Sequence, residues 1–261
     1  MAYMESAIPV ASDFIADEFF AFLNLIHHPP QMHRKLWEWA FILHHAEREG
    51  KVGPGMKGLG FGVGLEKLPS IFAARGCSIL ATDAPTEVGA QWKGSGEYSS
   101  NLDQCFFDFI VDRDTFIQKV AFEICDMKDI PFHLRNFDFC WSACALEHLG
   151  SIEAGFEFIE NSLKTLKPGG IALHTTELNL TSDTETVTQG PTVLYRRSDI
   201  EAFRTRLKHG GHKVRRIMPT VGPTAFDHHV DFPPYSHNPH LKLEIMNYVS
   251  TSIGLVIERG R

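Results

Sequence analysis

The segment Gly58–Gly64 constrains the fold of this chain more than any other, because glycine occupies every second position in it. It follows an apolar run and precedes a stretch of helical periodicity, which predicts a turn from a strand into a helix. Glycines there let backbone N–H groups approach a ligand closely. Two familiar nucleotide-binding patterns do not fit: Leu65 stands where G-x-G-x-x-G needs its third glycine, and the chain contains no G-K-[ST] tripeptide.

From Met56 onward, short apolar runs alternate with stretches of helical periodicity. The runs are MKGLGF, CSILATD, KVAFEICD, NFDFCWSA and GGIALHTTE, which begin at residues 56, 77, 119, 136 and 169. This alternation predicts βαβ units and a parallel sheet. Farther along, we expect a helix over 198–211, strands over 212–219 and 251–260, and a long irregular loop over 220–242.

Residues 12–50 form a separate helical region. Apolar residues recur there at three- and four-residue spacing on both sides of a Pro-Pro pair, which predicts two helices. The predicted organisation is an N-terminal helical cap at 1–55 and a larger domain at 56–261, into which the 220–242 loop is inserted.

Four further landmarks follow the glycine-rich turn in order. Asp83 ends the second predicted strand, where a carboxylate can accept hydrogen bonds from both hydroxyls of a ribose or, alternatively, cap a helix. The others are Asp126-Met127 after the third strand, Trp141–Leu149 continuing the fourth, and Lys167–Gly170 before the fifth. This order favours a ligand site over a turn that binds nothing.

Over residues 56–177 these landmarks resemble the class I S-adenosylmethionine-dependent methyltransferases. The usual glycine-rich motif of that family has an acidic residue two positions before its first glycine. Gly58 occupies this position here, and Glu66 is a nearby substitute. The resemblance implies S-adenosyl-L-methionine as cofactor and a Rossmann-like α/β fold, with a seven-stranded, mostly parallel sheet and helices on both faces.

The resemblance also implies which residues hold the cofactor. They are Gly60, Phe61, Gly62 and Gly64 for the methionyl and ribose region, Asp83 for the ribose, Ala84 for an adenine face, Asp126 and Met127 for the adenine edge, and Ser142 beside the methionyl group. Because the methyl group of such a cofactor is already activated, the protein mainly has to align donor and acceptor and to exclude water.

The acceptor is expected near the carboxyl ends of the strands, where ligands of open α/β sheets bind. His148, with Glu147 beside it, is the predicted general base, because an imidazole can take a hydroxyl proton near neutral pH. The alternative is a glutamate that starts a helix and a histidine packed against the sheet. In the N-terminal helices, the aromatic stripe that includes Trp37 is expected in the core, with contact of Trp37 or Arg34 to the cofactor or substrate as the alternative.

The 220–242 loop is rich in side chains that bind polar ligands. Its predicted substrate contacts are His228, His229, Asp231, Tyr235 and His237. Imidazoles and carboxylates bond hydroxyls and aromatic rings offer flat faces, so the composition favours a sugar-like acceptor. The same residue types ligate divalent metals, but their spacing matches no familiar motif and no metal is assigned. A plain surface loop is the third alternative.

Composition narrows the partners. The chain has 25 Lys and Arg against 32 Asp and Glu, a formal net charge of -7, which disfavours general binding of nucleic acid. No apolar run is long enough to span a membrane, and acidic residues stand where a signal peptide needs basic ones, so a cytoplasmic protein is expected. The five cysteines contain no CxxC pair and are expected to be free thiols.

The predicted function is therefore methyl transfer to a hydroxyl of a small polar, sugar-like molecule. One alternative is a nicotinamide-dependent Rossmann oxidoreductase, which the missing third glycine opposes. Another is a non-catalytic cofactor-binding module, which Gly58 in the acidic position allows. The Gly-Ser stretch Lys93–Glu97 is interpreted as an ordinary connection, with a mobile lid as the alternative.

Overall fold

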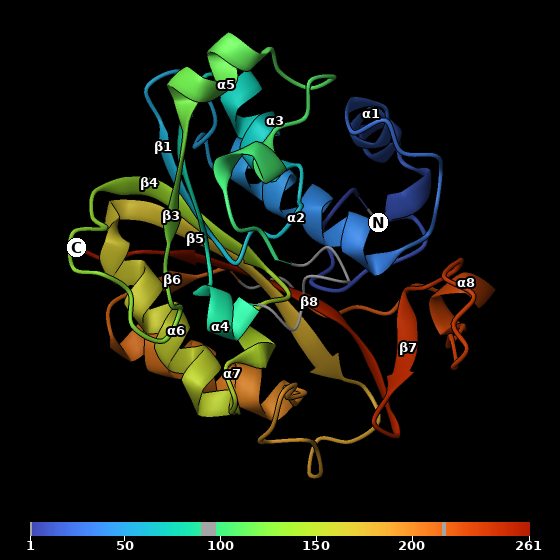
Figure 1. Cartoon of the computed structure of the whole chain (residues 1–261). Helices are drawn as coiled ribbons and strands as arrows, with labels where there is room; N and C mark the ends of the chain where they lie inside the picture. Colours follow the sequence, from blue (N-terminus) through green and yellow to red (C-terminus); the bar gives the residue numbers. More distant parts are fainter. Residues whose placement is uncertain (1, 90–97, 216–217) are drawn as a thin grey trace.

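The computed structural model describes residues 2–89, 98–215 and 218–261, so the Lys93–Glu97 connection lies outside the described residues (Figure 1). The α-helices are α1 (Asp17–Leu25), α2 (Arg34–Arg48), α3 (Leu68–Ala74), α4 (Thr86–Gly89), α5 (Arg113–Lys119), α6 (Ile152–Thr165), α7 (Arg197–His209) and α8 (Ala225–His228). The strands are β1 (Lys57–Phe61), β2 (Ser78–Asp83), β3 (Val120–Ile124), β4 (Phe137–Ala143), β5 (Leu166–Asn179), β6 (Lys213–Val214), β7 (Lys242–Ile245) and β8 (Tyr248–Glu258).

The strands form one sheet in the order β3-β2-β1-β4-β5-β8-β6, with β7 paired to β8. The pairs β1–β2, β2–β3, β1–β4 and β4–β5 are parallel, whereas β8 runs antiparallel to its three neighbours. β2 and β3 are added on one side of β1 and β4 and β5 on the other, so the strand order reverses between β1 and β4. Ligands of open α/β sheets bind at such a switch point.

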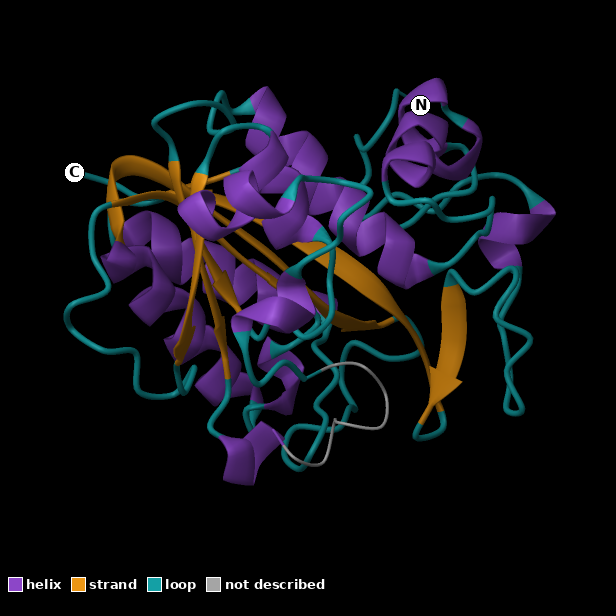
Figure 2. Ribbon diagram, turned by 45° about the horizontal axis from the view of Figure 1, so that its top comes forward, coloured by secondary structure: helices purple, strands orange, loops and turns teal. Residues whose placement is uncertain are grey.

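Helices cover both faces of the sheet (Figures 1 and 2). Residues of α1, α2, α3 and α5 pack in one apolar cluster, and those of α6 and α7 pack in a second cluster on the other face. α6 begins where the Ser151 side chain accepts a hydrogen bond from the Ala154 backbone N–H at 3.0 Å, satisfying one of its free donors. The predicted α/β fold with a mostly parallel sheet is thus confirmed.

Aromatic side chains on β4 explain why β1 is rich in glycine. A Cβ built on Gly58 would lie 2.4 Å from Cζ of Phe139, and one on Gly60 would lie 2.5 Å from Cζ2 of Trp141. Such distances are far inside van der Waals contact, so these two rings occupy the space that larger residues on β1 would need. The acid that the family usually carries at the Gly58 position has no room here.

The sheet has one strand more than the predicted seven. β7 and β8 form a hairpin whose two turn residues, Met246 and Asn247, both have positive φ angles of 51° and 67°. Turns of this kind usually contain Asn-Gly or Asp-Gly, so a Met-Asn turn carries little sequence signal and β7 escaped prediction. The strand predicted over 212–219 was too long, since among its described residues only Lys213 and Val214 pair with β8.

The two predicted N-terminal helices are confirmed as α1 and α2, and α2 packs directly on the sheet. Trp37 and Phe41 of α2 are fully buried, and the Trp37 indole N–H donates to the buried Asp13 carboxylate at 2.8 Å. Trp37 is therefore a core residue, as predicted, rather than a residue that contacts a ligand. The division into a cap at 1–55 and a domain at 56–261 stays a prediction.

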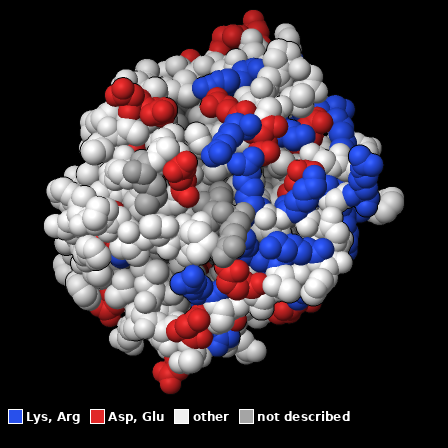
Figure 3. All heavy atoms as spheres, turned by 180° about the vertical axis from the view of Figure 1, so that it is seen from behind, with Lys and Arg blue, Asp and Glu red and all other residues white. Residues whose placement is uncertain are grey.

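On the face shown in Figure 3, most Lys and Arg side chains lie on one half, with Asp and Glu side chains between them. Among the described residues, no helix is both long and apolar enough to cross a bilayer. All five cysteines are free thiols, and each of them except Cys144 is buried.

Candidate active site

A cavity of about 650 Å³ opens beside the carboxyl ends of β1, β2, β3 and β4. Its size is within the range of small-molecule and cofactor sites. One part of its lining comes from the strand-to-helix turns: Gly62, Val63, Gly64, Leu65, Glu66, Asp83, Ala84, Val88, Asp126, Met127 and Lys128. The other part comes from α2 and from segments that follow β4 and α8: His33, Lys35, Trp39, Ala143, Cys144, Ala145, His148, Leu149 and His237. We call these two parts the turn wall and the helix wall.

The glycine-rich turn leaves β1 through Gly62 and Gly64, which have positive φ angles of 59° and 49°. Few residues other than glycine adopt this conformation without strain. A Cβ on Gly62 would also lie 3.1 Å from the Cβ of Ala145. Glycine is thus needed here for both the backbone path and the close approach of the turn to the segment after β4.

Asp83, at the end of β2, connects the turn after β2 to the glycine-rich turn after β1. Its Oδ2 accepts hydrogen bonds from the backbone N–H groups of Gly64 and Ser99, both at 2.9 Å, and its Oδ1 accepts from that of Ala84 at 2.7 Å. Burial raises the pKa of this carboxyl, although the three backbone donors act in the opposite direction. Asp83 therefore fixes the turn wall and also presents its carboxylate to the cavity.

Glu66 supplies a second buried acid to the same wall. Its side chain accepts a hydrogen bond from the indole N–H of Trp141, and burial raises its pKa to about 8. The Trp141 ring leaves no space for a side chain at Gly60 and also holds the carboxyl group of Glu66, two residues after Gly64. Glu66 thus lines the cavity, whereas the Gly58 position does not, and this placement could not be read from the sequence pattern.

Some predicted cofactor residues lie outside the cavity lining. Gly60 faces the ring of Trp141, and Phe61 is fully buried against Phe158, with ring centroids 5.2 Å apart. Ser142 is also fully buried, and its hydroxyl pairs with Nδ1 of His174 at 2.8 Å. Successive side chains of a strand point to opposite faces of the sheet. Because these strands are apolar on both faces, the sequence did not show to which face each side chain points.

Of the pair predicted to supply the general base, His148 is part of the helix wall and Glu147 is buried behind it. His148 lines the cavity, and its Nδ1 lies 2.9 Å from the carbonyl oxygen of Pro191. Because a carbonyl only accepts, the neutral ring carries its proton on Nδ1 and its lone pair on Nε2. Glu147 is buried, which raises its pKa, and its Oε2 accepts a hydrogen bond from Thr176 Oγ1 at 3.1 Å.

A buried ionic network supports the helix wall from beneath. Arg34 of α2 pairs with Glu177 of β5 and lies 3.7 Å from Glu38, while Nζ of Lys35 lies 3.1 Å from the other oxygen of Glu38. Burial disfavours the charged form of Glu38, yet Lys35 and Arg34 together lower its pKa. These pairs hold Lys35 at the cavity with its charge balanced.

The predicted substrate residues of the 220–242 loop separate into three groups. His237 lines the cavity, whereas His228 and His229 are exposed and outside its lining. Asp231 is buried within the loop, and the Tyr235 hydroxyl donates to the Glu244 carbonyl at 2.6 Å. Composition alone could not separate these positions, since all of them are polar residues of one irregular segment.

His33 was not predicted, but it lines the cavity beside His237. It caps α2, where its Nδ1 accepts a hydrogen bond from the Lys35 backbone N–H at 3.1 Å. Its ring stacks on that of His240, with centroids 4.6 Å apart. Burial lowers the pKa of His33 to about 3, with the neighbouring His240 and Arg34 acting in the same direction.

The family model described as a methyltransferase domain matches residues 59–174, which include the turn wall and most of the segment after β4. The predicted resemblance to the class I S-adenosylmethionine-dependent methyltransferases is thus confirmed over residues 59–174. This methyltransferase is an enzyme whose cofactor is S-adenosylmethionine, as predicted, rather than a nicotinamide-dependent oxidoreductase or a non-catalytic module.

Solved structures with the same fold are distant in sequence. A protein assigned as a sarcosine dimethylglycine methyltransferase from Galdieria sulphuraria is 11% identical with a TM-score of 0.52, over 85% of this chain and 84% of that chain. A protein assigned as a methyltransferase from Bacillus halodurans is 13% identical with a TM-score of 0.50, over 84% of this chain and 99% of that chain. No curated protein matches the chain in sequence.

The turn wall of this methyltransferase fits its cofactor. Gly62 and Gly64 line the cavity without side chains, Asp83 offers a carboxylate at the end of β2, and Asp126 and Met127 follow β3. A sulfur nucleoside needs such a set, with acceptors for its hydroxyls and ammonium and an apolar side for its base.

Proposed function

We propose that this methyltransferase transfers a methyl group to a hydroxyl oxygen of a small, polar, sugar-like molecule. One observation carries the proposal: the turn wall and His148 line a single cavity, and the hydrogen bond at Nδ1 directs the lone pair of the neutral His148 ring to Nε2. A base and a cofactor site that share one cavity can act on the same bound acceptor.

We further propose how the turn wall holds the cofactor. The backbone at Gly62 and Gly64 accommodates the methionyl and ribose region, Gly60 and Phe61 of β1 support this turn from outside the cavity, and Asp83 accepts the ribose hydroxyls. The adenine lies along Ala84 with Asp126 and Met127 at its edge, while Glu66 receives the methionyl ammonium in place of an acid at Gly58. Ser142 lies outside the cavity lining and supports the end of β4 through its hydrogen bond with His174.

When bound, S-adenosylmethionine supplies an electrophilic methyl group on a sulfonium. The methyl group would pass from sulfur to the acceptor oxygen, the C–S bond would break and S-adenosylhomocysteine would leave, while Nε2 of His148 would take the hydroxyl proton of the acceptor. The Nδ1–H of His148 donates a hydrogen bond to the Pro191 carbonyl, which keeps the ring in the tautomer that can act as a base. Glu147, buried behind His148, positions this segment through Thr176.

The helix wall offers what a polyhydroxylated acceptor needs. Trp39 presents a flat indole face, and Lys35, His33 and His237 present nitrogen groups from the same side of the cavity. Sugar rings pack on flat apolar faces while their hydroxyls bond to polar groups, so this mixture supports a sugar-like acceptor. The assignment of one relative as a sarcosine dimethylglycine methyltransferase makes a secondary or tertiary amine the acceptor class to compare.

The proposal is tested by incubating the protein with S-adenosylmethionine and panels of acceptors, and by measuring release of S-adenosylhomocysteine. One panel holds monosaccharides, polyols and hydroxy acids, and the other holds glycine, sarcosine and ethanolamine derivatives. Turnover on the hydroxyl panel, with one added methyl group located on oxygen by mass spectrometry and NMR, is the expected result. Turnover on the amine panel alone would overturn the oxygen acceptor and leave the cofactor assignment intact.

A further inference from the structure

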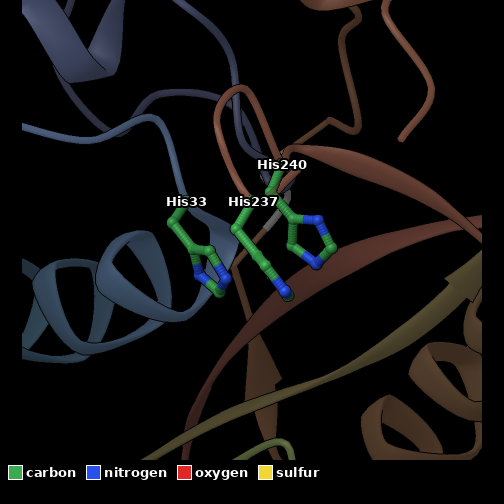
Figure 4. A group of neighbouring side chains, drawn as sticks. All are labelled: His33, His237 and His240. Atoms are coloured by element: carbon green, nitrogen blue, oxygen red, sulfur yellow. The ribbon is translucent and has the colours of Figure 1, made fainter. Parts of the chain in front are cut away.

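Three histidines converge at the rim of the cavity from two segments far apart in the sequence. His33 begins α2, and His237 and His240 belong to the segment between α8 and β7 (Figure 4). One ring nitrogen of each lies within 4.8 Å of a nitrogen of the other two. The ring centroids of His237 and His240 are 5.1 Å apart and the His33 ring stacks on that of His240, so the three rings form one cluster.

A buried carboxylate orients the innermost ring. His240 is buried, and its Nδ1 lies 2.7 Å from Oδ2 of Asp231, which is buried as well. The pairing puts the proton on Nδ1 and leaves the lone pair of the neutral ring on Nε2. Histidines that ligate metals in proteins are oriented in this way by a carboxylate on their other nitrogen.

The same carboxylate also fixes the backbone that carries the second ring. Asp231 accepts hydrogen bonds from the backbone N–H groups of Ser236 and His237, both at 2.9 Å. Asp231 therefore fixes both His237 and His240.

Backbone hydrogen bonds join the two segments directly. The Arg34 N–H donates to the His240 carbonyl at 3.0 Å, and the His240 N–H donates to the Met32 carbonyl at 2.7 Å. The Gln31 side chain also donates to the His237 carbonyl at 2.8 Å. The three rings are thus held near one another by the fold itself and not by a chance approach of surface loops.

We propose that His33, His237 and His240 bind a divalent transition-metal ion of the zinc class. Three imidazoles leave a fourth tetrahedral position open, as in the catalytic zinc sites of proteins. His33 and His237 also line the cavity, so we place the open position on the cavity side. The charge of Arg34, which follows His33 in the chain, is balanced by Glu38 and Glu177.

The three histidines differ in how well their present hydrogen bonds orient them for metal binding. His240 is oriented by Asp231, whereas Nδ1 of His33 serves as the cap of α2, so ligation by the His33 ring gives up that hydrogen bond. We therefore expect loss of His240 to weaken metal binding most and loss of His33 to weaken it least. The ion would bind and orient an oxygen atom of the acceptor, a role that rests on the proposed methyl transfer.

Zinc binding is tested on the full chain after removal of any polyhistidine tag. The protein is dialysed against Zn²⁺, the bound metal is counted by elemental analysis, and Co²⁺ is used as a spectroscopic probe. The variants are His240→Ala, His237→Ala and His33→Ala. His229→Ala is the matched control, because His229 is an exposed histidine of the same segment outside the cluster.

We expect one Zn²⁺ per chain in the unchanged protein and in His229→Ala, and a visible Co²⁺ spectrum typical of tetrahedral nitrogen ligation. His240→Ala and His237→Ala should each weaken Zn²⁺ binding by at least about tenfold while S-adenosylmethionine still binds, which shows that the variant is folded. Asp231→Asn should weaken it by about 10- to 100-fold.

Substoichiometric zinc in the unchanged protein, or equal zinc in His237→Ala and His229→Ala, would overturn the site. His237 is exposed, so its substitution should not disturb folding. Because metal content is measured without an acceptor, failure of the hydroxyl panel in the activity screen would leave this result standing, and the reverse also holds.

Discussion

The turn wall and the helix wall face each other across one cavity but are built in different ways. In the turn wall, residues stand at or just after the ends of strands, and short-range contacts hold them, such as that of Asp83 to Gly64, which are 19 residues apart; Glu66, which Trp141 holds from 75 residues away, is the exception. In the helix wall, the segment that leads into α2 meets a segment 206 residues later, as in the hydrogen bond from Gln31 to the His237 carbonyl. A cofactor site made of short-range turns leaves a sequence pattern, and an acceptor site made of long-range contacts does not.

The largest expected effect tests the chemistry assigned to the helix wall. His148→Gln should lower kcat by about 10²- to 10⁴-fold, because a positioned general base contributes this much. The affinity for S-adenosylmethionine should stay unchanged, because the turn wall is intact. Steady-state kinetics on the acceptor identified by the screen, with calorimetric titration of the cofactor, measures both. A variant with the original rate across pH 6–9 would remove His148 from the mechanism.

The next effect concerns the residue that links the turns. Asp83→Ala should weaken S-adenosylmethionine binding by about 1–3 kcal/mol, because charge-assisted hydrogen bonds are lost. It should also lower the free energy of unfolding, since the N–H groups of Gly64, Ser99 and Ala84 lose their acceptor. Calorimetry and denaturant unfolding test the two effects. Unchanged cofactor affinity in a folded variant would place Asp83 outside the site.

A third test asks why the turn wall lacks the usual acid. Gly58→Ala should lower the free energy of unfolding by about 1–3 kcal/mol, because the added Cβ meets the ring of Phe139. Combining it with Phe139→Leu, which makes room, should cost less than the sum of the two single changes. Additive losses in urea unfolding would show that the two positions do not compete for space.

A smaller effect depends on pH. Burial raises the folded-state pKa of Glu66 to about 8, above its value in an unfolded chain, so the folded protein holds a proton there that the unfolded chain has lost. Stability should therefore fall as pH rises from about 4.5 to about 8, and it should fall less in Glu66→Gln, which stays neutral.

The same substitution tests the cofactor role of Glu66. Below about pH 8 its neutral carboxyl resembles a glutamine, whereas above that pH its charge attracts the methionyl ammonium. The loss of S-adenosylmethionine affinity in Glu66→Gln should grow to about tenfold as pH rises through this range. An equal loss at all pH values would argue against a charge interaction.

The smallest effects are expected in the outer part of the 220–242 loop. His228→Ala and Tyr235→Phe should change cofactor affinity and kcat by less than about 0.5 kcal/mol in each measure, because both side chains lie outside the cavity lining. Tyr235→Phe should lower stability by about 0.5–1.5 kcal/mol, because the hydrogen bond to the Glu244 carbonyl is lost. A large effect on KM for the acceptor would show that this part of the loop folds over the bound acceptor.

Much of the sheet could be predicted, because its strands are marked by apolar runs between turns. β1 to β5, β8, α1, α2 and α7 all match predicted segments. β7 was missed because its hairpin turn lacks glycine, and β6 was predicted too long. Ser142 and Phe61 are buried and lie outside the cavity lining. Their orientation could not be predicted, because a strand that is buried on both faces has apolar residues on both and shows no alternation in its sequence.

The sequence by itself determined the family, the cofactor and the turn wall, because glycines and acids at strand ends act through their own short turns. Only the tertiary structure decided that Phe139 and Trp141 exclude side chains from β1, that Trp141 brings Glu66 into the cavity, and that His33 meets His237 and His240. These contacts join residues far apart in the chain. Their positions follow from packing across the sheet and between α2 and the segment after α8, which no local pattern of residues encodes.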